Sequence, residues 1–262
     1  MLAKKRQDKI CALLAENGAV RTATLVELFG VSLETVRRDL LQMEEKGLLQ
    51  KVHGGAVATG EMQTFPSFSI RENTHEDEKR MLARHAMQYI SEGDIIGIDS
   101  GSTAKVFASV LRESKEKLTV VTYSLDVFHL LAGYKSFSVI LCGGQFLQSE
   151  NAFYGNLSAD MLQKLHMQKV FIFPSAISLR GGICDFQPEI FDMQRLLRMR
   201  GDRAFFLADS SKFEKKGFMQ ITEISAEDTL ITDGALPETL RAIYRENGVN
   251  LICGKESEHA DR

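Results

Sequence analysis

The stretch of residues 94–105, DIIGIDSGSTAK, is the clearest structural signal in this chain. The apolar run 95–98 is short and has polar neighbours on both sides, a pattern typical of a buried β-strand. The residues after it are small and rich in hydroxyl groups, and a helical pattern follows directly. The stretch therefore predicts a strand that passes through a tight loop into a helix, which is one half of a parallel β-α-β unit.

Further strands and helices alternate on either side of this stretch, from Glu76 onward. Helical patterns separate most of the strand candidates, and this alternation favours a mostly parallel sheet with helices on its faces. The predicted fold of this part is therefore α/β. The strand candidates are residues 94–99, 118–122, 137–142, 169–173, 203–208, 229–232 and 249–253.

The loop after residue 98 has two interpretations. It is an ordinary helix start with Ser102 or Thr103 as its cap, or it is an anion site. In the second case the free N–H groups, the positive helix end and the hydroxyls hold a phosphate. Asp99 would repel a phosphate at close range, so we expect it to accept hydrogen bonds from sugar hydroxyls or to orient the loop, and we favour the sugar contact.

Polar loops follow three other strand candidates in the same way, at residues 122–124, 143–145 and 209–213. Ligands of open parallel sheets bind at the carboxyl ends of the strands, so we expect the four loops to converge on one site. Lys212 is then the natural cation for a phosphate or a sugar oxygen. Each loop taken singly is equally well explained as an exposed connection.

The front of the chain carries three helical patterns and a short hairpin. The helices are predicted at residues 4–16, 22–29 and 33–46, and two short strands surround a Gly-Gly turn at residues 48–57. Helix, tight turn and helix followed by a hairpin is the layout of a winged helix-turn-helix. Residues 58–75 are polar and interrupted by Gly60 and Pro66, which indicates a linker.

The third helix has the features of a DNA reader. Ser32 is a good N-cap, and Leu33, Val36, Leu40 and Met43 share one apolar face. Arg38 lies opposite and is the best candidate for a base edge, whereas Arg37 is expected at phosphate. The alternative is an ordinary amphipathic helix with solvated arginines. The residues expected at DNA are Ser32, Thr35, Arg37, Arg38, Gln42, and Lys51 and His53 of the wing.

Composition favours a cytoplasmic protein. Residues 1–58 carry nine basic and seven acidic side chains, and the remainder carries 23 and 28, so the front is mildly basic. This asymmetry is a weak sign of an anionic partner for the front. We expect neither a secretory signal nor a membrane span, because the start lacks an apolar segment and no run approaches about 18 apolar residues.

The cysteines and histidines are scattered. The four cysteines form no C-x-x-C pair, which favours reduced thiols, although Cys142 and Cys184 lie in predicted ligand loops where a redox sensor is the alternative. The six histidines form no cluster with the cysteines. We therefore expect no metal site and no cofactor.

Residues 25–58, LVELFGVSLETVRRDLLQMEEKGLLQKVHGGAVA, resemble the winged helix-turn-helix of the DeoR/GlpR family of bacterial repressors of sugar catabolism. Farther on, DSGST, TYS, CGG and LADSSKF are similar to signature stretches of the sensor domain of that family. The resemblance implies a DNA-binding module at residues 3–58, with the helix-turn-helix at about 20–39. It also implies a linker at 59–75 and an α/β sensor domain at 76–255, similar in fold to ribose-5-phosphate isomerase.

The same resemblance implies a function. It predicts a repressor of a carbohydrate-utilisation operon that binds double-stranded operator DNA as a homodimer or homotetramer, with a phosphorylated sugar as its effector. Carried over by match, the residues expected at the effector are Asp99, Gly101, Ser102, Thr103, Thr122, Ser124, Gly144, Asp209 and Lys212.

Four places depart from the family pattern and touch the expected site. Tyr123 stands where the family usually has Asn, and residues 173–178, FPSAIS, replace a Gly-rich stretch. In the later helix, Asp192 and Gln194 stand where the family has Glu and Lys.

The alternative function is a sugar-phosphate isomerase. Moving a proton between two carbons requires a carboxylate base and groups that stabilise an enediolate. The isomerases that this chain resembles carry an acidic cluster after the fourth strand, where this chain has Pro-Ser-Ala-Ile-Ser. Asp185 and Glu189 remain, but nothing marks them as a base pair, so we expect a sensor and not an enzyme.

Overall fold

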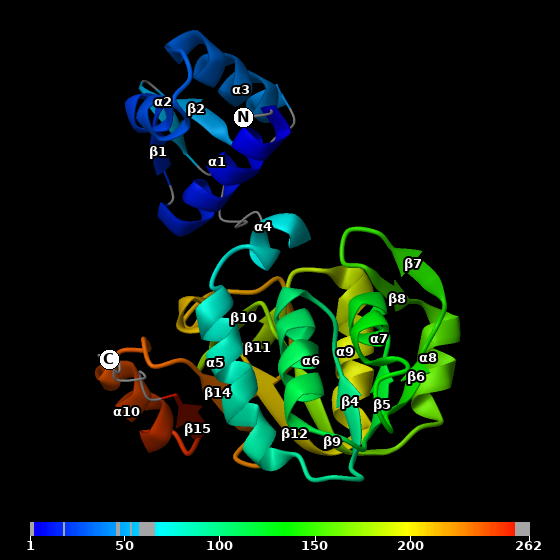
Figure 1. Cartoon of the computed structure of the whole chain (residues 1–262). Coiled ribbons are helices and arrows are strands. Elements are labelled where there is room, and N and C mark those ends of the chain that lie inside the picture. The colour runs from blue at the N-terminus through cyan, green and yellow to red at the C-terminus, as the bar shows by residue number, and fades with distance from the viewer. Residues whose placement is uncertain (1–2, 18, 46–47, 53, 58–65, 255–262) are drawn as a thin grey trace, which may run out of the picture. The chain divides into compact units, whose positions relative to one another are not determined.

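Two units make up the chain, Met1–Thr74 and His75–Arg262. The computed structural model describes residues 3–17, 19–45, 48–52, 54–57 and 66–254 (Figure 1). Each unit has a hydrophobic core of its own, so each is built like a separate domain.

The first unit combines three helices with a small antiparallel sheet. The helices are α1 (Ala3–Asn17), α2 (Thr22–Phe29) and α3 (Leu33–Glu45). The sheet has the order β1-β3-β2, with β1 (Ala19–Arg21), β2 (Gln50–Val52) and β3 (Gly55–Val57). The predicted helices and hairpin are confirmed, whereas β1 is absent from the prediction because three residues between two helices carry no periodic signal.

The core of this unit fills the space between the three helices. The fully or almost fully buried side chains are Ile10, Leu14, Leu25, Val36, Leu40, Met43 and Leu49. Of the four residues predicted to share the apolar face of α3, Leu33 is the exception to burial, since its side chain is 45% exposed. Leu33 is the first residue of α3 and therefore projects past the end of the core.

A buried ion pair joins α1 to α3. Arg6 Nε donates to Asp39 Oδ2 at 2.7 Å, and Arg6 Nη2 donates to Asp39 Oδ1 at 3.2 Å. The two parallel hydrogen bonds fix the relative orientation of the helices more strictly than apolar packing does, because a bidentate pair tolerates little rotation. Asp39 therefore faces the core side of α3 and leaves the opposite side of the helix to other residues.

The Gly-Gly turn of the wing has a steric reason. A Cβ on Gly55 would lie 2.0 Å from the carbonyl oxygen of Val20 in β1, so only glycine permits the pairing of β1 with β3. Gly54 has φ +83°, a conformation that favours glycine. Both glycines are thus required by the fold of the wing itself.

Part of the predicted linker is helical. Residues 58–65 lie outside the described residues, but α4 (Phe68–Glu72) forms a short helix within the segment that was expected to be irregular. Asn73 ends it, and His75, at φ 54°, precedes α5 (Glu76–Ala86). The predicted boundary at residue 76 lies one residue from the boundary between the two units.

The second unit is built on a parallel sheet of seven strands in the order β15-β14-β12-β9-β4-β5-β6. All seven predicted strands are present, and the α/β fold class is confirmed. Strand order reverses between β4 and β9, because the chain first builds outward from β4 and later builds outward from β9. The strands are β4 (Ile95–Ile98), β5 (Thr119–Thr122), β6 (Ser138–Leu141), β9 (Met167–Ile172), β12 (Gly201–Leu207), β14 (Thr229–Thr232) and β15 (Asn250–Cys253).

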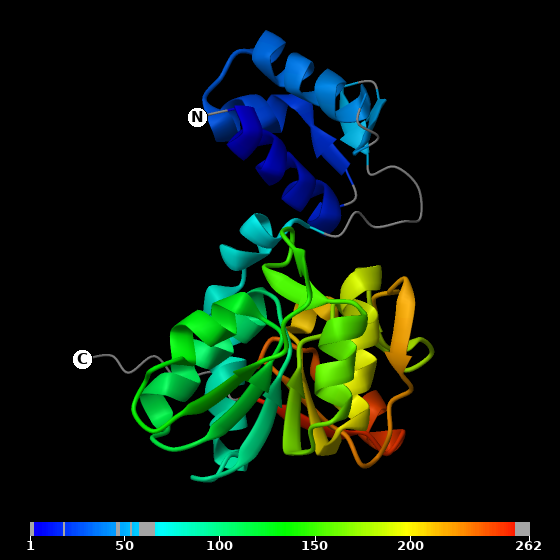
Figure 2. The same cartoon turned by 90° about the vertical axis from the view of Figure 1, so that its right-hand side faces the viewer.

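Helices cover both faces of this sheet (Figure 2). Helix α5, α6 (Ser102–Ser114) and α7 (Leu125–Leu131) pack on one face, around Phe107 and Phe171. Helices α8 (Asn156–Gln163), α9 (Pro188–Met199) and α10 (Glu238–Glu246) pack on the other, around Leu197 and Phe206. The two apolar clusters explain why the strands read as continuous apolar runs.

Small elements extend the connections beyond the sheet, and the sequence patterns do not predict them. A hairpin of β7 (Gln145–Leu147) and β8 (Ala152–Tyr154) follows β6. An antiparallel sheet has the order β10-β11-β13, with β10 (Ala176–Ser178), β11 (Gly182–Asp185) and β13 (Met219–Thr222). Two 3-10 turns complete the unit, η1 (Met87–Tyr89) and η2 (Ser210–Lys212).

Gly97 allows the closest packing in the centre of the sheet. A Cβ at this position would meet Leu197 Cδ1 at 2.7 Å, Met167 Sδ at 2.8 Å and Val170 Cγ1 at 3.0 Å. We predict that Gly97→Ala lowers the free energy of unfolding by about 1–3 kcal/mol, because the added methyl overpacks the core. Gly143→Ala is the matched control, since its Cβ meets nothing within 4 Å. Denaturant unfolding measures both, and equal stability of the two variants would contradict the prediction.

Candidate functional site

The start of α3 is an exposed, capped helix end. Ser32 Oγ accepts a hydrogen bond from the backbone N–H of Thr35 at 3.2 Å and lies 2.9 Å from Thr35 Oγ1. This is the predicted N-cap, and it holds both hydroxyls at the positive end of the helix. Two hydroxyls beside free N–H groups form a local arrangement that suits a phosphate of a nucleic-acid backbone.

Arg37 and Arg38 are exposed on α3, and within the described residues no hydrogen bond or ion pair engages either guanidinium. Gln42 is exposed as well, and its Oε1 accepts a hydrogen bond from Gln7 of α1 at 3.1 Å. The side chain of Lys51 is exposed, and its backbone N–H donates to Glu44 at 2.7 Å, which ties the wing to α3. His53, the other wing residue expected at DNA, lies outside the described residues.

The loop after β4 leads into α6, whose start has no capping side chain. Gly101 is the N-cap of α6, with φ 103°, and no side chain caps the helix. Ser102 and Thr103 are the first two helical residues and their side chains are buried, so the interpretation of either as the cap is wrong. The first N–H groups of α6 therefore depend on something other than a capping side chain for their hydrogen bonds.

Asp99 lies completely buried at the end of β4, and hydrogen-bond donors surround its carboxylate. Its Oδ1 accepts from the backbone N–H of Ser100 at 2.6 Å and from the hydroxyl of Tyr123. Its Oδ2 accepts from the backbone N–H of Phe173 at 3.0 Å and from Gln194 Nε2 at 3.0 Å. Each oxygen thus has two donors, and neither is exposed. Asp99 therefore orients the loop, and the predicted direct contact with a sugar hydroxyl is wrong.

A second buried carboxylate, Asp185, shares one of these donors. Gln194 Nε2 donates to Asp185 Oδ2 at 3.0 Å, and Ser175 Oγ donates to the same oxygen at 3.1 Å. Asp185 Oδ1 accepts from the backbone N–H groups of the next two residues at 2.7 and 3.2 Å. One neutral amide therefore bridges two carboxylates.

Departures from the family pattern gather in this cluster. Tyr123, Ser175 and Gln194 each donate a hydrogen bond to Asp99 or Asp185. Sequence reasoning marked these positions as unusual but did not identify their partners. The sequence does contain one indication of this cluster: three polar residues depart from the family pattern at positions expected along one edge of the sheet.

Three other predicted effector residues have structural roles. The side chain of Thr122 is buried and its Oγ1 accepts from the backbone N–H of Ser124 at 3.0 Å. Ser124 Oγ caps α7 by accepting from Val127 N at 3.3 Å. Gly144 is exposed, and a Cβ there would lie 2.3 Å from Ser158 Oγ of α8. These residues shape the rim of the sheet edge.

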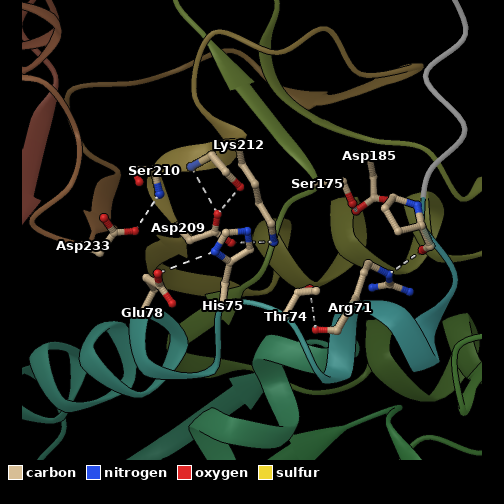
Figure 3. Close-up of polar contacts among 12 residues, drawn as sticks. Arg71, Thr74, His75, Glu78, Ser175, Asp185, Asp209, Ser210, Lys212 and Asp233 are labelled. Atoms are coloured by element: carbon tan, nitrogen blue, oxygen red, sulfur yellow. Dashed lines mark hydrogen bonds and ion pairs between the residues drawn. The ribbon is translucent and has the colours of Figure 1, made fainter. Parts of the chain in front are cut away.

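A charged cluster lies at the ends of β12 and β14 (Figure 3). Asp209 is buried after β12, with its carboxylate 3.8 Å from Lys212 Nζ. Ser211 donates to Asp209 from its backbone N–H, at 3.2 Å, and from its hydroxyl. His75 points toward Asp209, and the buried Lys79 also acts on its charge.

The protonation of Asp209 follows from these neighbours. Burial by itself raises the pKa of a carboxyl group, but the charge of Lys212 and the hydrogen bond of Ser211 lower it. The charges of His75 and Lys79 act in the same direction, and together the four bring the pKa of Asp209 below its ordinary value. Asp209 is therefore a stable carboxylate that holds cations beside it.

Two residues outside the predicted site complete this cluster. Asp233, directly after β14, accepts from the backbone N–H of Ser210 at 2.7 Å and so fixes the loop of η2. Glu78 of α5 lies 3.6 Å from the imidazole of His75. The signal for Asp233 was its place after an apolar strand, which it shares with Asp99 and Asp209.

Most of the predicted effector residues thus fall into two groups at one edge of the sheet, and Gly144 lies farther along this edge, after β6. One group surrounds Asp99 at the ends of β4, β5 and β9, where the strand order reverses, and the other surrounds Asp209 at the ends of β12 and β14. Strand β9 separates β4 from β12, so the groups are neighbours across one strand. Asp192 is exposed and takes no part in the hydrogen bonds around Asp99.

The remaining features point away from redox chemistry. Cys142 and Cys184 are buried, and burial raises the pKa of both thiols, that of Cys142 to about 11. A thiol with a raised pKa forms little thiolate, which disfavours a redox sensor. Among the described residues, no three His, Cys, Asp or Glu side chains are grouped as metal ligands, and no helix is long and apolar enough to cross a membrane.

Family models match both units. Residues 6–61 match the DeoR-like helix-turn-helix domain, and residues 74–234 match the DeoR C terminal sensor domain. The second match alone covers more than half of the chain.

Two regulators show how far the similarity extends. The L-fucose operon activator of Haemophilus influenzae is 31% identical over 94% of this chain and 98% of its own length. The lactose phosphotransferase system repressor of Staphylococcus epidermidis is 32% identical over 87% of this chain and 91% of its own length. The names of both relatives describe regulators, one an activator and the other a repressor.

A solved structure shows partial similarity. Ribose 5 phosphate isomerase A from Neisseria gonorrhoeae is 20% identical, with a TM-score of 0.41 over 53% of this chain and 54% of its own. A similarity of this size concerns part of the fold and says nothing about reaction or ligand.

Burial raises the pKa of Asp99 to about 6, although the hydrogen bonds of Phe173, Tyr123, Gln194 and Ser100 act in the opposite direction. The native state therefore holds this proton more tightly than the unfolded chain. We predict that the free energy of unfolding falls by roughly 2–3 kcal/mol as pH rises from about 4 to about 6. In this range the unfolded chain releases the proton of Asp99, whereas the native state still holds it.

Carbon NMR of the aspartate carboxyl groups measures the midpoint directly. A midpoint of Asp99 near 4 would contradict the prediction. Denaturant unfolding across the same pH range measures the stability, with groups of lowered pKa such as Asp209 acting in the opposite direction.

Proposed function

This chain belongs to the DeoR family of transcriptional regulators, and from that premise we propose that it represses a carbohydrate-utilisation operon and releases its operator when a phosphorylated sugar binds. We assign operator binding to residues 3–58 and effector binding to residues 76–255, joined by the segment 59–75. The names of the two relatives concern fucose and lactose, which supports a sugar-related operon. One is an activator and the other a repressor, so the sign of regulation is part of the proposal.

Helix α3 carries the DNA-binding half of the proposal. Its exposed face presents two guanidinium groups that have no partner among the described residues, beside a helix start capped by Ser32. A helix of this kind enters the major groove, where Arg38 reads guanine and Arg37 neutralises phosphate. Thr35 and Gln42 flank Arg38, and Lys51 and His53 extend the contact from the wing.

The effector half rests on the edge of the parallel sheet. The uncapped start of α6, at Gly101, Ser102 and Thr103, offers N–H groups to a phosphate. Lys212 supplies the cation at the neighbouring strand ends, where Asp209 holds it. Thr122, Ser124 and Gly144 form the rim, and Asp99 positions the loop from beneath.

Regulation requires the effector to favour one arrangement of the chain over another. We place that change in the segment between the operator-binding and effector-binding parts. A single winged module buries too little surface for tight specific binding, so the proposal includes a homodimer or homotetramer on repeated half-sites.

Replacing Arg38 tests the assignment of the base contact. We predict that Arg38→Ala weakens binding to an operator selected from a random library by about 10–100-fold, because a bidentate contact to guanine is lost. Binding to a scrambled duplex changes much less. Arg37→Ala weakens both duplexes similarly and reduces the salt dependence by about one phosphate contact.

Fluorescence anisotropy at several salt concentrations measures these affinities. The control is Lys164→Ala, an exposed cation of the second unit. Equal losses on both duplexes for Arg38→Ala would make it a phosphate contact only.

Replacing Lys212 tests the effector site. We predict that Lys212→Ala leaves operator affinity within about twofold and raises the concentration of sugar phosphate needed for release by at least about tenfold, because the phosphate loses its cation. Lys212→Arg retains part of the response, and the exposed Lys215→Ala serves as the matched control. A screen of hexose and pentose phosphates against the operator complex provides the measurement, and an unchanged response in Lys212→Ala would remove this lysine from the site.

A further inference from the structure

Several buried acceptors among the described residues of the effector-binding part have no donor, and one of them is Gln194 Oε1. Gln194 Oε1 makes no hydrogen bond, although the residue is only 1% exposed. Buried polar atoms without partners are rare, and each one requires an explanation such as a water molecule or a ligand. This atom lies beside the carboxylates at the end of β4, where the strand order reverses and ligands of open α/β sheets bind.

The neighbours of Gln194 determine which way its amide faces. Nε2 lies 3.0 Å from Asp99 Oδ2 and 3.0 Å from Asp185 Oδ2, and both of these oxygens only accept hydrogen bonds at neutral pH. Turning the amide over would place its oxygen against two carboxylates and lose both bonds. The unpartnered acceptor is therefore a fixed feature of the site.

The carboxylate acceptors of this cluster are already occupied. Asp99 and Asp185 each receive two donors at each oxygen, and Tyr123 and Ser175 are among these donors, although their hydroxyl oxygens keep the capacity to accept. Gln194 Oε1 is thus a buried acceptor of this cluster that a new hydrogen-bond donor can satisfy.

Asp99 also connects this acceptor to the proposed phosphate cradle. One of its oxygens holds Gln194, and the other holds the backbone N–H of Ser100, just before the start of α6. A sugar phosphate held at that helix start would bring its own hydroxyls toward the same carboxylate. Asp99 therefore positions both Gln194 and the loop at the start of α6.

We propose that Gln194 is a specificity-determining residue of the effector site, whose Oε1 accepts a hydrogen bond from one hydroxyl of the bound sugar phosphate. The inference rests on the proposed function and deepens it, because it adds a rule for the sugar. The effector must carry a hydroxyl at the carbon that faces Gln194. A sugar phosphate that lacks this hydroxyl leaves the acceptor unpaired and binds weakly.

Gln194→Lys separates the acceptor from the donors. A lysine ammonium donates hydrogen bonds to both carboxylates and has no acceptor, so the variant keeps the bridge and removes only Oε1. Its added charge strengthens the binding of every phosphorylated ligand alike. A cycle that compares ligand pairs in both proteins cancels that common effect.

The experiment uses isothermal titration calorimetry on the full chain. Glucose 6-phosphate, fructose 6-phosphate, galactose 6-phosphate and ribose 5-phosphate are titrated first, with inorganic phosphate as reference. The tightest ligand is then compared with its monodeoxy analogues in both proteins. We expect the loss of one particular hydroxyl to weaken binding by about 10–100-fold in the unmodified chain and by less than about threefold in Gln194→Lys.

The outcomes distinguish the two levels of the proposal. If each deoxy analogue loses the same factor in both proteins, Gln194 Oε1 makes no hydrogen bond to the sugar and the assignment is overturned. If no sugar phosphate binds the unmodified chain, the proposed function fails and the inference fails with it. Should Gln194→Lys not fold, as judged by thermal unfolding, Gln194→Met removes the same acceptor at similar volume and enters the same cycle.

Discussion

Burial of the Asp99 carboxylate is the interaction on which the architecture of the sheet edge depends. A buried charge is tolerated only where hydrogen bonds replace its hydration, and Asp99 obtains four donors from separate segments of the chain. These donors belong to the loops after β4, β5 and β9 and to α9. One carboxylate therefore connects the ends of three strands to a single helix by hydrogen bonds. These hydrogen bonds support the start of α6 from beneath and fix the position of the loop that follows β4.

Much of this organisation follows from sequence, and the reason is periodicity. Each of the seven parallel strands is a short apolar run with polar ends, and such runs are visible without a structure. The helix-turn-helix is equally visible, because Ser32 and the apolar positions of α3 are local signals. The loops after these strands, including those of Asp99 and Asp209, lie at one edge of the sheet because the strands are parallel, and the ligand site that we expect there stays a prediction.

Pairings between distant residues could not be predicted, since nothing local encodes them. Gln194 meets Asp99 across 95 positions, and Arg6 meets Asp39 across 33. The same limit explains why the sequence suggested a sugar contact for Asp99: its exposure depends on whether later segments cover it, and α9 and the loop after β9 do so.

Sharing one neutral amide between Asp99 and Asp185 also gives the site a polarity. At neutral pH this end carries carboxylates with no cation among their hydrogen-bond partners, whereas the neighbouring strand ends hold Lys212. In the effector site that we propose, the groups that attract an anion, the start of α6 and Lys212, therefore lie beside the ligand, whereas the carboxylates lie beneath it with every oxygen already hydrogen-bonded. The consequence is a division of the site, in which the phosphate is expected at the rim and the uncharged hydroxyls are expected over the carboxylates.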